Sequence, residues 1–305
     1  MAEPRAGLLA EILSIARYHI MLVAMAATVV FGWIATGQRP WALTLVVTVD
    51  WFLINLMNRI TDIDEDLRNG IPGTERVAGR KRLLTVGSVV LMVGSFAITH
   101  AIWPALTPYR IAVQLIGIGY NYRVVPTPRG LSRFKEIYFF KNFGSSVLFV
   151  LTCFVYPLAA ASFERVVPWA AIVALALFFV PFELTYEILY DMRDLEGDRL
   201  GKIPTYPVVH GLEPSRRIID ALLAAAAVVL VVAFVLRIVG VRELLMVVAP
   251  VAQLFFYRPR YRRGLTSRDC IVLTHLGTAQ LALFIVGTAV WSRAGLPTNV
   301  FFGGP

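Results

Sequence analysis

The chain has 305 residues, of which 57% are hydrophobic and only 16% are charged, and its formal net charge is +9. A mean hydropathy of +0.68 excludes an ordinary soluble domain and indicates a polytopic membrane protein that is surrounded by membrane lipid. The positive charge does not indicate nucleic-acid binding, because the basic residues alternate from loop to loop. We therefore expect no nucleic-acid partner.

Apolar segments of roughly membrane-spanning length follow one another along the sequence. Their continuous apolarity lacks the alternation of a membrane β-barrel, so the expected fold class is all-α, a polytopic transmembrane helical bundle. No polar linker of domain-separating length appears, which predicts one integral-membrane domain over residues 1–305. About nine transmembrane helices are expected, near residues 15–35, 41–60, 83–103, 108–124, 143–162, 167–190, 218–239, 241–257 and 270–292.

Basic residues are concentrated in alternate loops. The loops after the second, fourth, sixth and eighth segments hold twenty Lys and Arg residues, whereas the opposite side holds six. This asymmetry predicts a cytoplasmic N-terminus, an external C-terminus and a multi-pass protein of the cell (inner) membrane. The six residues counted on the outer side are Arg39, Arg110, Arg165, Arg237, Arg242 and Arg293.

Two short acidic clusters end the second and sixth segments, on the predicted cytoplasmic side. The first contains Asn58, Asp62 and Asp66, and the second contains Asp191, Asp194 and Asp198. On a helix, residues four apart advance by only about 40° around the axis, so each cluster presents one oxygen-rich face. The two halves of the chain thus look like loose echoes of each other, with quasi-equivalent acidic helix ends.

Carboxylates at the end of a membrane helix require compensation by a metal, an ion pair or water. Hard oxygen ligands suit Mg²⁺, which commonly bridges carboxylates to substrate phosphates, so two such faces are able to hold one diphosphate. We predict a magnesium site at these six residues, and the catalytic positions are Asp62, Asp66, Asp194 and Asp198. The alternative is that the acids only pair with nearby arginines at the membrane surface.

The spacing around both clusters resembles that of the UbiA superfamily of intramembrane prenyltransferases. Asn58, Asp62 and Asp66 fit its N-x-x-x-D-x-x-x-D motif, and Asp194 and Asp198 fit its D-x-x-x-D motif, which Asp191 extends. The resemblance implies a helical bundle with a cavity open toward lipid, in which Mg²⁺ held by both motifs binds an isoprenyl diphosphate. It also implies transfer of the isoprenyl group to a lipophilic acceptor (an aromatic compound, a quinone precursor or a lipid), with release of diphosphate.

The chain departs from the family pattern at two positions. Arg59 follows Asn58 where many relatives have aspartate, and Tyr190 stands where relatives often have lysine. A tyrosine supplies a hydroxyl rather than a positive charge, so diphosphate binding must draw its cations elsewhere. The diphosphate-binding candidates are Asn58, Arg76, Lys81, Arg129, Lys135, Tyr190 and Lys202, with Arg133 and Arg193 as further basic neighbours.

Two glutamates, Glu183 and Glu187, lie in the last turns of the sixth apolar segment. They are candidates for positioning an acceptor or taking its proton, and the alternative is a pair with a neighbouring arginine. Aromatic residues of the same segment, including Phe178 and Phe182, either stabilise a carbocation or simply pack.

Two other functions remain open from the sequence. A terpene cyclase of UbiA type would ionise the same diphosphate without using an acceptor. A transporter is the alternative outside enzymes, although its ionisable groups would usually lie near the middle of the membrane, where this chain has few.

Overall fold

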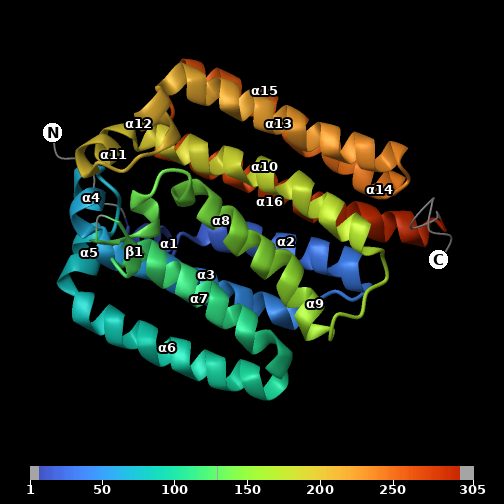
Figure 1. The fold of residues 1–305 in the computed structure, drawn as a ribbon, viewed down its shortest axis with the longest axis horizontal. Coiled ribbons are helices and arrows are strands. Elements are labelled where there is room, and N and C mark those ends of the chain that lie inside the picture. The colour runs from blue at the N-terminus through green and yellow to red at the C-terminus, as the bar shows by residue number, and fades with distance from the viewer. Residues whose placement is uncertain (1–6, 129, 296–305) are drawn as a thin grey trace.

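The computed structural model describes residues 7–128 and 130–295, and long helices run side by side along its longest axis (Figure 1). The predicted all-α fold is confirmed. The long helices are α2 (Tyr18–Thr36), α3 (Trp41–Thr61), α6 (Lys81–Ile102), α7 (Thr107–Asn121), α8 (Phe140–Val150), α10 (Trp169–Arg193), α13 (Leu212–Val235), α15 (Val248–Arg262) and α16 (Ser267–Arg293).

Seven helical spans in the described ranges are long and apolar enough to cross a membrane. One of them, Phe140–Ala160, joins α8, a π-helical turn (Leu151–Val155) and α9 (Tyr156–Ala160). α7 and α15 have 15 residues each and overlap two further predicted segments, near 108–124 and 241–257, but they are shorter than the roughly 20 residues of a typical span. The chain is thus a multi-pass helical membrane protein, and the count of nine stays a prediction.

Short elements gather at the end of the bundle where the N-terminal helix lies (Figure 1). They are α1 (Leu8–Ala16), α4 (Ile63–Arg68), α5 (Thr74–Gly79), the antiparallel strands β1 (Val125–Thr127) and β2 (Gly130–Ser132), the 3₁₀ helix η2 (Phe134–Glu136), α11 (Leu195–Gly201) and α12 (Tyr206–His210). At the opposite end lie the 3₁₀ helix η1 (Pro104–Leu106), α14 (Val241–Leu244) and the 3₁₀ helix η4 (Leu245–Val247). Both acidic clusters therefore lie at one end of the bundle.

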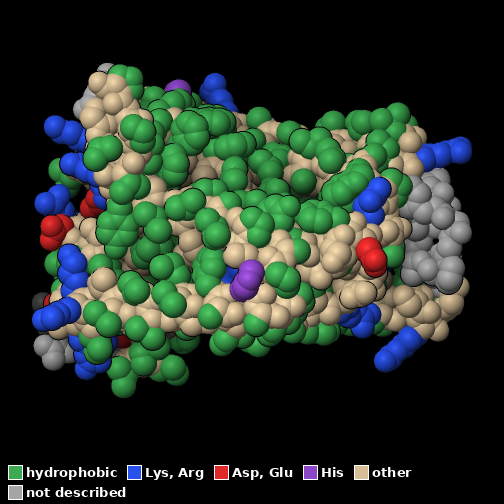
Figure 2. All heavy atoms as spheres, turned by 60° about the horizontal axis from the view of Figure 1, so that its bottom comes forward, with side chains coloured by type: hydrophobic (Ala, Val, Ile, Leu, Met, Phe, Trp, Pro, Cys, Tyr) green, Lys and Arg blue, Asp and Glu red, His purple; other side chains and the backbone are tan. Residues whose placement is uncertain are grey.

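The outer surface has the character expected for contact with lipid. Figure 2 shows hydrophobic side chains over the middle of one face, with charged side chains mainly toward its two ends. Helix α6 illustrates this, because Leu83, Val90 and Val93 are each more than 60% exposed. Such large exposed apolar side chains are stable only where lipid covers them.

A buried ion pair joins three helices in the interior. Asp50 of α3 and Arg110 of α7 are both fully buried, with Arg110 Nε 2.9 Å from Asp50 Oδ2. The Asp50 carboxylate also accepts hydrogen bonds from Tyr156 Oη at 2.9 Å and Gln114 Nε2 at 3.0 Å, and Arg110 Nη1 donates to Thr99 of α6 at 2.9 Å. The sequence analysis counted Arg110 with the outer basic residues. Its guanidinium lies inside the bundle, where it pairs with Asp50, so Arg110 is not a loop residue.

We expect Arg110→Met to destabilise the fold by about 3–5 kcal/mol, since it leaves a buried carboxylate without its cation. The free energy of unfolding in detergent micelles measures this effect, and Lys81→Met on an exposed side chain of α6 serves as the control. The double variant Asp50→Asn/Arg110→Met should lose less stability than the sum of the two single variants. Additive losses would show that the pair is not coupled.

Candidate active site

One cavity of about 890 Å³ runs into the bundle from the end that carries the acidic clusters. Residues of both clusters line its mouth, which brings the two clusters together as predicted. Further in, its walls are mainly apolar and come chiefly from α2, α3, α8, α10 and α16. The aromatic side chains of the walls include Phe31, Trp51, Phe149, Phe178, Phe179, Phe182, Phe284 and Trp291.

The two clusters have the same local backbone structure. In each, a long helix ends at an aspartate, Asp62 after α3 and Asp194 after α10, and a short helix follows. Backbone hydrogen bonds of the i to i+4 type continue through both joints, from Asp66 N to Asp62 O and from Asp198 N to Asp194 O. The helical spacing therefore survives the break, and the acidic residues stay on one face.

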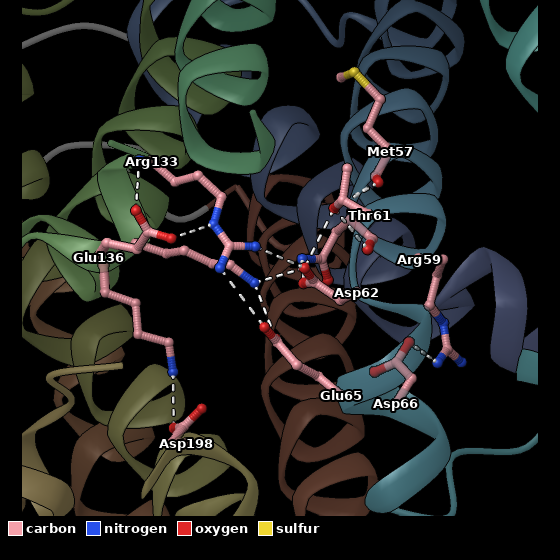
Figure 3. A network of polar contacts seen from close by, with 12 residues as sticks. Met57, Arg59, Thr61, Asp62, Glu65, Asp66, Arg133, Glu136 and Asp198 are labelled. Atoms are coloured by element: carbon pink, nitrogen blue, oxygen red, sulfur yellow. Dashed lines mark hydrogen bonds and ion pairs between the residues drawn. The ribbon is translucent and has the colours of Figure 1, made fainter. Parts of the chain in front are cut away.

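The central loop supplies the cations for the first cluster. Lys135 Nζ of η2 lies 2.7 Å from Asp62 Oδ1 and 3.1 Å from Glu65 Oε2. Arg133 Nη1 lies 3.3 Å from the same Asp62 oxygen, and Figure 3 shows Arg133 pointing toward Asp62 and Glu65. Asn58 donates a hydrogen bond to Asp62 from within the cluster. These contacts compensate a carboxylate that is only 6% exposed.

Arg59, the first departure from the family pattern, forms a salt bridge with Asp66, the last residue of the first cluster. Its Nη1 lies 2.7 Å from Asp66 Oδ2, and its Nη2 donates to Ser14 Oγ at 2.9 Å. The guanidinium thereby links α3 to α4 and to the amphipathic helix α1. An aspartate at position 59 could not donate these hydrogen bonds.

Lys141, at the start of α8, compensates the second cluster. It pairs with Asp191 and lies 3.2 Å from Asp198 Oδ2, while Asn142 Nδ2 donates to Asp191 at 2.7 Å. Asp194 pairs with Arg193 instead, with Nε 2.7 Å from Oδ1. Burial raises the pKa of the Asp198 carboxyl to about 6, and the neighbouring Lys141 charge opposes this rise.

The short helices that follow the two clusters pack directly on each other. A Cβ atom at Gly197 of α11 would lie only 2.5 Å from Asn69 Oδ1, next to the end of α4. A Cβ at Gly201 would meet Glu65 Oε1 at 3.8 Å. Figure 3 shows Asp62 and Glu65 on one side of the site and Asp198 on the other.

The acidic residues at the cavity mouth are paired with cations and amides in this structure. In the described ranges, no three His, Cys, Asp or Glu residues converge as a ready set of metal ligands. The carboxylates contact cations instead, so the alternative of simple ion pairing is found at Asp66 and Asp194. The donor chemistry nevertheless fits Mg²⁺, because hard carboxylate and amide oxygens from both clusters line one cavity mouth.

The predicted site residues fall into two groups. Eight of them line the cavity: Asn58, Asp62, Asp66, Lys135, Tyr190, Asp191, Asp194 and Asp198. Arg76, Lys81 and Lys202 do not, because Arg76 pairs with Glu11 at 2.6 Å and the two lysines are exposed to the surroundings. Arg129 lies outside the described residues.

Three cations that line the cavity, Arg59, Lys141 and Arg242, were not among the diphosphate-binding candidates, and neither was Arg17, whose position at the start of the first apolar segment fits either a place in the cavity or a side chain that extends to the membrane surface. Lys141 and Arg242 occupy positions typical of topological charges, so nothing in the sequence distinguished them. Tyr190 itself bonds Thr274, with 3.1 Å between the two hydroxyl oxygens, and the Arg193 guanidinium lies 4.7 Å from its ring centre. Arg193 thus places a positive charge beside Tyr190.

Solved structures with the same fold include two of a UbiA homologue from Archaeoglobus fulgidus. The one described as bound to GPP and Mg²⁺ has a TM-score of 0.67 and 18% identity, and covers 92% of this chain and 99% of that chain. The one described as bound to DMAPP and Mg²⁺ has a TM-score of 0.68 and 19% identity, and covers 92% of this chain and 98% of that chain.

Two sequence comparisons agree with this fold. A digeranylgeranylglyceryl phosphate synthase of Haloquadratum walsbyi is 30% identical over 105 residues, which are 34% of this chain and only 36% of the relative's length. The family model of the UbiA prenyltransferase family matches residues 132–284, half of the chain. The chain therefore belongs to the UbiA prenyltransferase family.

Proposed function

We propose that the protein is a Mg²⁺-dependent intramembrane prenyltransferase. It transfers an isoprenyl group from an isoprenyl diphosphate to a lipophilic acceptor, which is an aromatic compound, a quinone precursor or a lipid, and it releases diphosphate. The observation that carries this proposal is the lining of the large cavity: two acidic clusters and several cations line its mouth, and aromatic side chains line its interior. The diphosphate of the substrate would lie among the charged residues of the mouth, and its isoprenyl chain would lie among the apolar residues of the interior.

The residues of the mouth have separate tasks. The oxygens of Asn58, Asp62, Asp66, Asp191, Asp194 and Asp198 would hold Mg²⁺. When bound, Mg²⁺ neutralises charge on the leaving diphosphate and so favours cleavage of the allylic C–O bond. Lys135, Lys141 and Arg193 offer positive charges to the phosphate oxygens.

The interior of the cavity protects the reacting carbon. Phe149, Phe178 and Phe182 are more than 90% buried within the bundle and line its wall. Aromatic faces attract a cation, and an apolar wall excludes the water that would otherwise capture an allylic cation. The acceptor attacks the allylic carbon in this dry space.

The relatives support the substrate class. The A. fulgidus homologue is described with GPP or DMAPP and Mg²⁺, and the H. walsbyi relative is named for a prenylated glyceryl phosphate. We further propose a single domain over residues 1–305, nine spans and a cytoplasmic N-terminus in the cell (inner) membrane. The active site then faces the cytoplasm, since twenty basic residues lie in loops on that side.

We expect Asp62→Ala and Asp194→Ala each to lower Mg²⁺-dependent diphosphate release by about 100-fold or more, because each removes a charge placed for the transition state. Membranes bearing the protein, supplied with a panel of prenyl diphosphates and lipid extract, provide the assay. Asp64→Ala and Glu196→Ala are the matched controls, since both side chains are exposed and lie outside the cavity lining. Full activity in either test variant would contradict the assignment, and a cyclic hydrocarbon formed without acceptor would indicate a cyclase.

We expect Lys141→Met to raise the KM for the prenyl diphosphate by about tenfold, which corresponds to roughly 1.4 kcal/mol of lost binding. Lys141→Arg should retain more of the affinity, because it keeps the positive charge. Steady-state kinetics and competition by inorganic pyrophosphate measure the effect, with the exposed Lys202→Met as the control. An unchanged KM in folded Lys141→Met would show that this ammonium does not bind the diphosphate.

A further inference from the structure

Polar groups line the cavity below the acidic clusters, where an apolar prenyl tail could not form hydrogen bonds with them. Glu183 and Glu187 of α10, Ser145 of α8 and Asn55 of α3 all line it. The sequence analysis left open a pair between either glutamate and a neighbouring arginine. Within the described ranges neither glutamate forms a salt bridge, and their hydrogen-bond donors are serines.

The two carboxylates share too few donors. Ser145 Oγ lies 3.0 Å from Glu183 Oε1 and 3.0 Å from Glu187 Oε1, but a serine hydroxyl has a single proton to donate. Ser146 donates to the other oxygen of Glu183. Glu187 has no second donor among the described residues, and it lines the cavity wall. An additional donor inside the cavity would therefore be bound favourably.

A buried donor lies at the same depth on the opposite helix. The rings of Trp51 on α3 and Phe149 on α8 pack with their centres 4.3 Å apart. α3 ends and α8 begins at the mouth, so the two helices are antiparallel (Figure 1). Asn55 and Ser145 each lie four residues nearer the mouth than these rings, about one turn of 5.4 Å on both helices.

Asn55 is itself short of a partner. The residue is 4% exposed, and its Nδ2 has no hydrogen-bond partner within the described part of the chain. This depth of the cavity thus presents a donor that lacks an acceptor, Asn55 Nδ2, and a carboxylate, Glu187, whose one donor is shared with Glu183. A hydroxyl group satisfies both, because it donates one hydrogen bond and accepts others. The reacting carbon of an aromatic ring satisfies neither.

We infer that Asn55, Ser145, Glu183 and Glu187 form the binding site for the nucleophilic hydroxyl of the acceptor, with Glu187 taking its proton. This inference rests on the proposed prenyltransferase function and narrows its acceptor to an alcohol that is prenylated at oxygen. The C–O bond between the allylic carbon and the diphosphate breaks, and diphosphate leaves with the electron pair. A lone pair of the acceptor oxygen forms the new C–O bond, the hydroxyl proton passes to the Glu187 carboxylate, and the product is an ether.

The first experiment identifies the atom that receives the prenyl group. Reconstituted full-length protein is supplied with Mg²⁺, a panel of prenyl diphosphates and one of three acceptors: a mono-O-alkylglyceryl phosphate, the same lipid with its free hydroxyl methylated, or 4-hydroxybenzoate. Cell lipid extract is the fourth condition. Mass spectrometry should find an ether product, and methylation of the hydroxyl should remove it. A product linked through carbon, or diphosphate release that no hydroxyl acceptor increases, would overturn the inference.

The second experiment tests the proton acceptor. Glu187→Gln keeps a side-chain oxygen that accepts from Ser145 but cannot take a proton, so kcat for ether formation should fall by about 100-fold. KM for the prenyl diphosphate should stay unchanged, and Glu187→Asp should recover part of kcat. The exposed Glu75→Gln on α5 is the control, and thermal unfolding in detergent checks that each variant is folded.

The outcomes separate the two proposals. If the unmodified protein releases no diphosphate under any of these conditions, prenyl transfer itself fails. If it makes the ether and folded Glu187→Gln retains kcat within about threefold, only the role of Glu187 fails. A fall in kcat that accompanies an equal rise in KM for the diphosphate would indicate a distorted mouth and would also overturn the assignment.

Discussion

The structure depends on compensating carboxylates that are buried at the ends of membrane helices. Asp62 and Asp191 are almost inaccessible, and each is neutralised by a lysine, Lys135 for the first and Lys141 for the second. Removing one partner of such a pair is strongly destabilising, because the other charge remains buried. Both lysines come from one short stretch between η2 and the start of α8. This stretch therefore ties together two acidic clusters that lie more than 120 residues apart in sequence.

The helical bundle and the acidic faces could be predicted because both follow from local periodicity. The face of the first cluster survives even though α3 ends at Asp62, since the i to i+4 backbone hydrogen bonds cross the joint. Basic residues were harder to assign. A loop position says which side of the membrane an arginine occupies but not where its side chain points, and Arg76 turns back to Glu11 on α1. Lys141 was missed for the same reason, because its role depends on the packing of α8 against α10.

The interior shows a second limit of sequence reasoning. Asp50 is a charged residue within an apolar segment, and its partner Arg110, which was counted with the outer basic residues, lies 60 residues away in the sequence. Only the packing of α7 against α3 brings the two together. The lengths of α7 and α15 were also not predictable from apolarity. Both segments were predicted to span the membrane, but each of these helices has only 15 residues. Apolarity predicts burial in lipid or protein, whereas a helix is limited by its turns and caps.

Because Gly197 has no side chain, α11 can lie close to Asn69 at the end of α4. The distance between the two acidic clusters therefore depends on the absence of a side chain at this position. An alanine at position 197 would push the Asn69 amide aside, while a glycine or alanine at position 69 would restore the room. The two positions are therefore expected to vary jointly among homologues, a correlation that separate treatment of either motif would overlook.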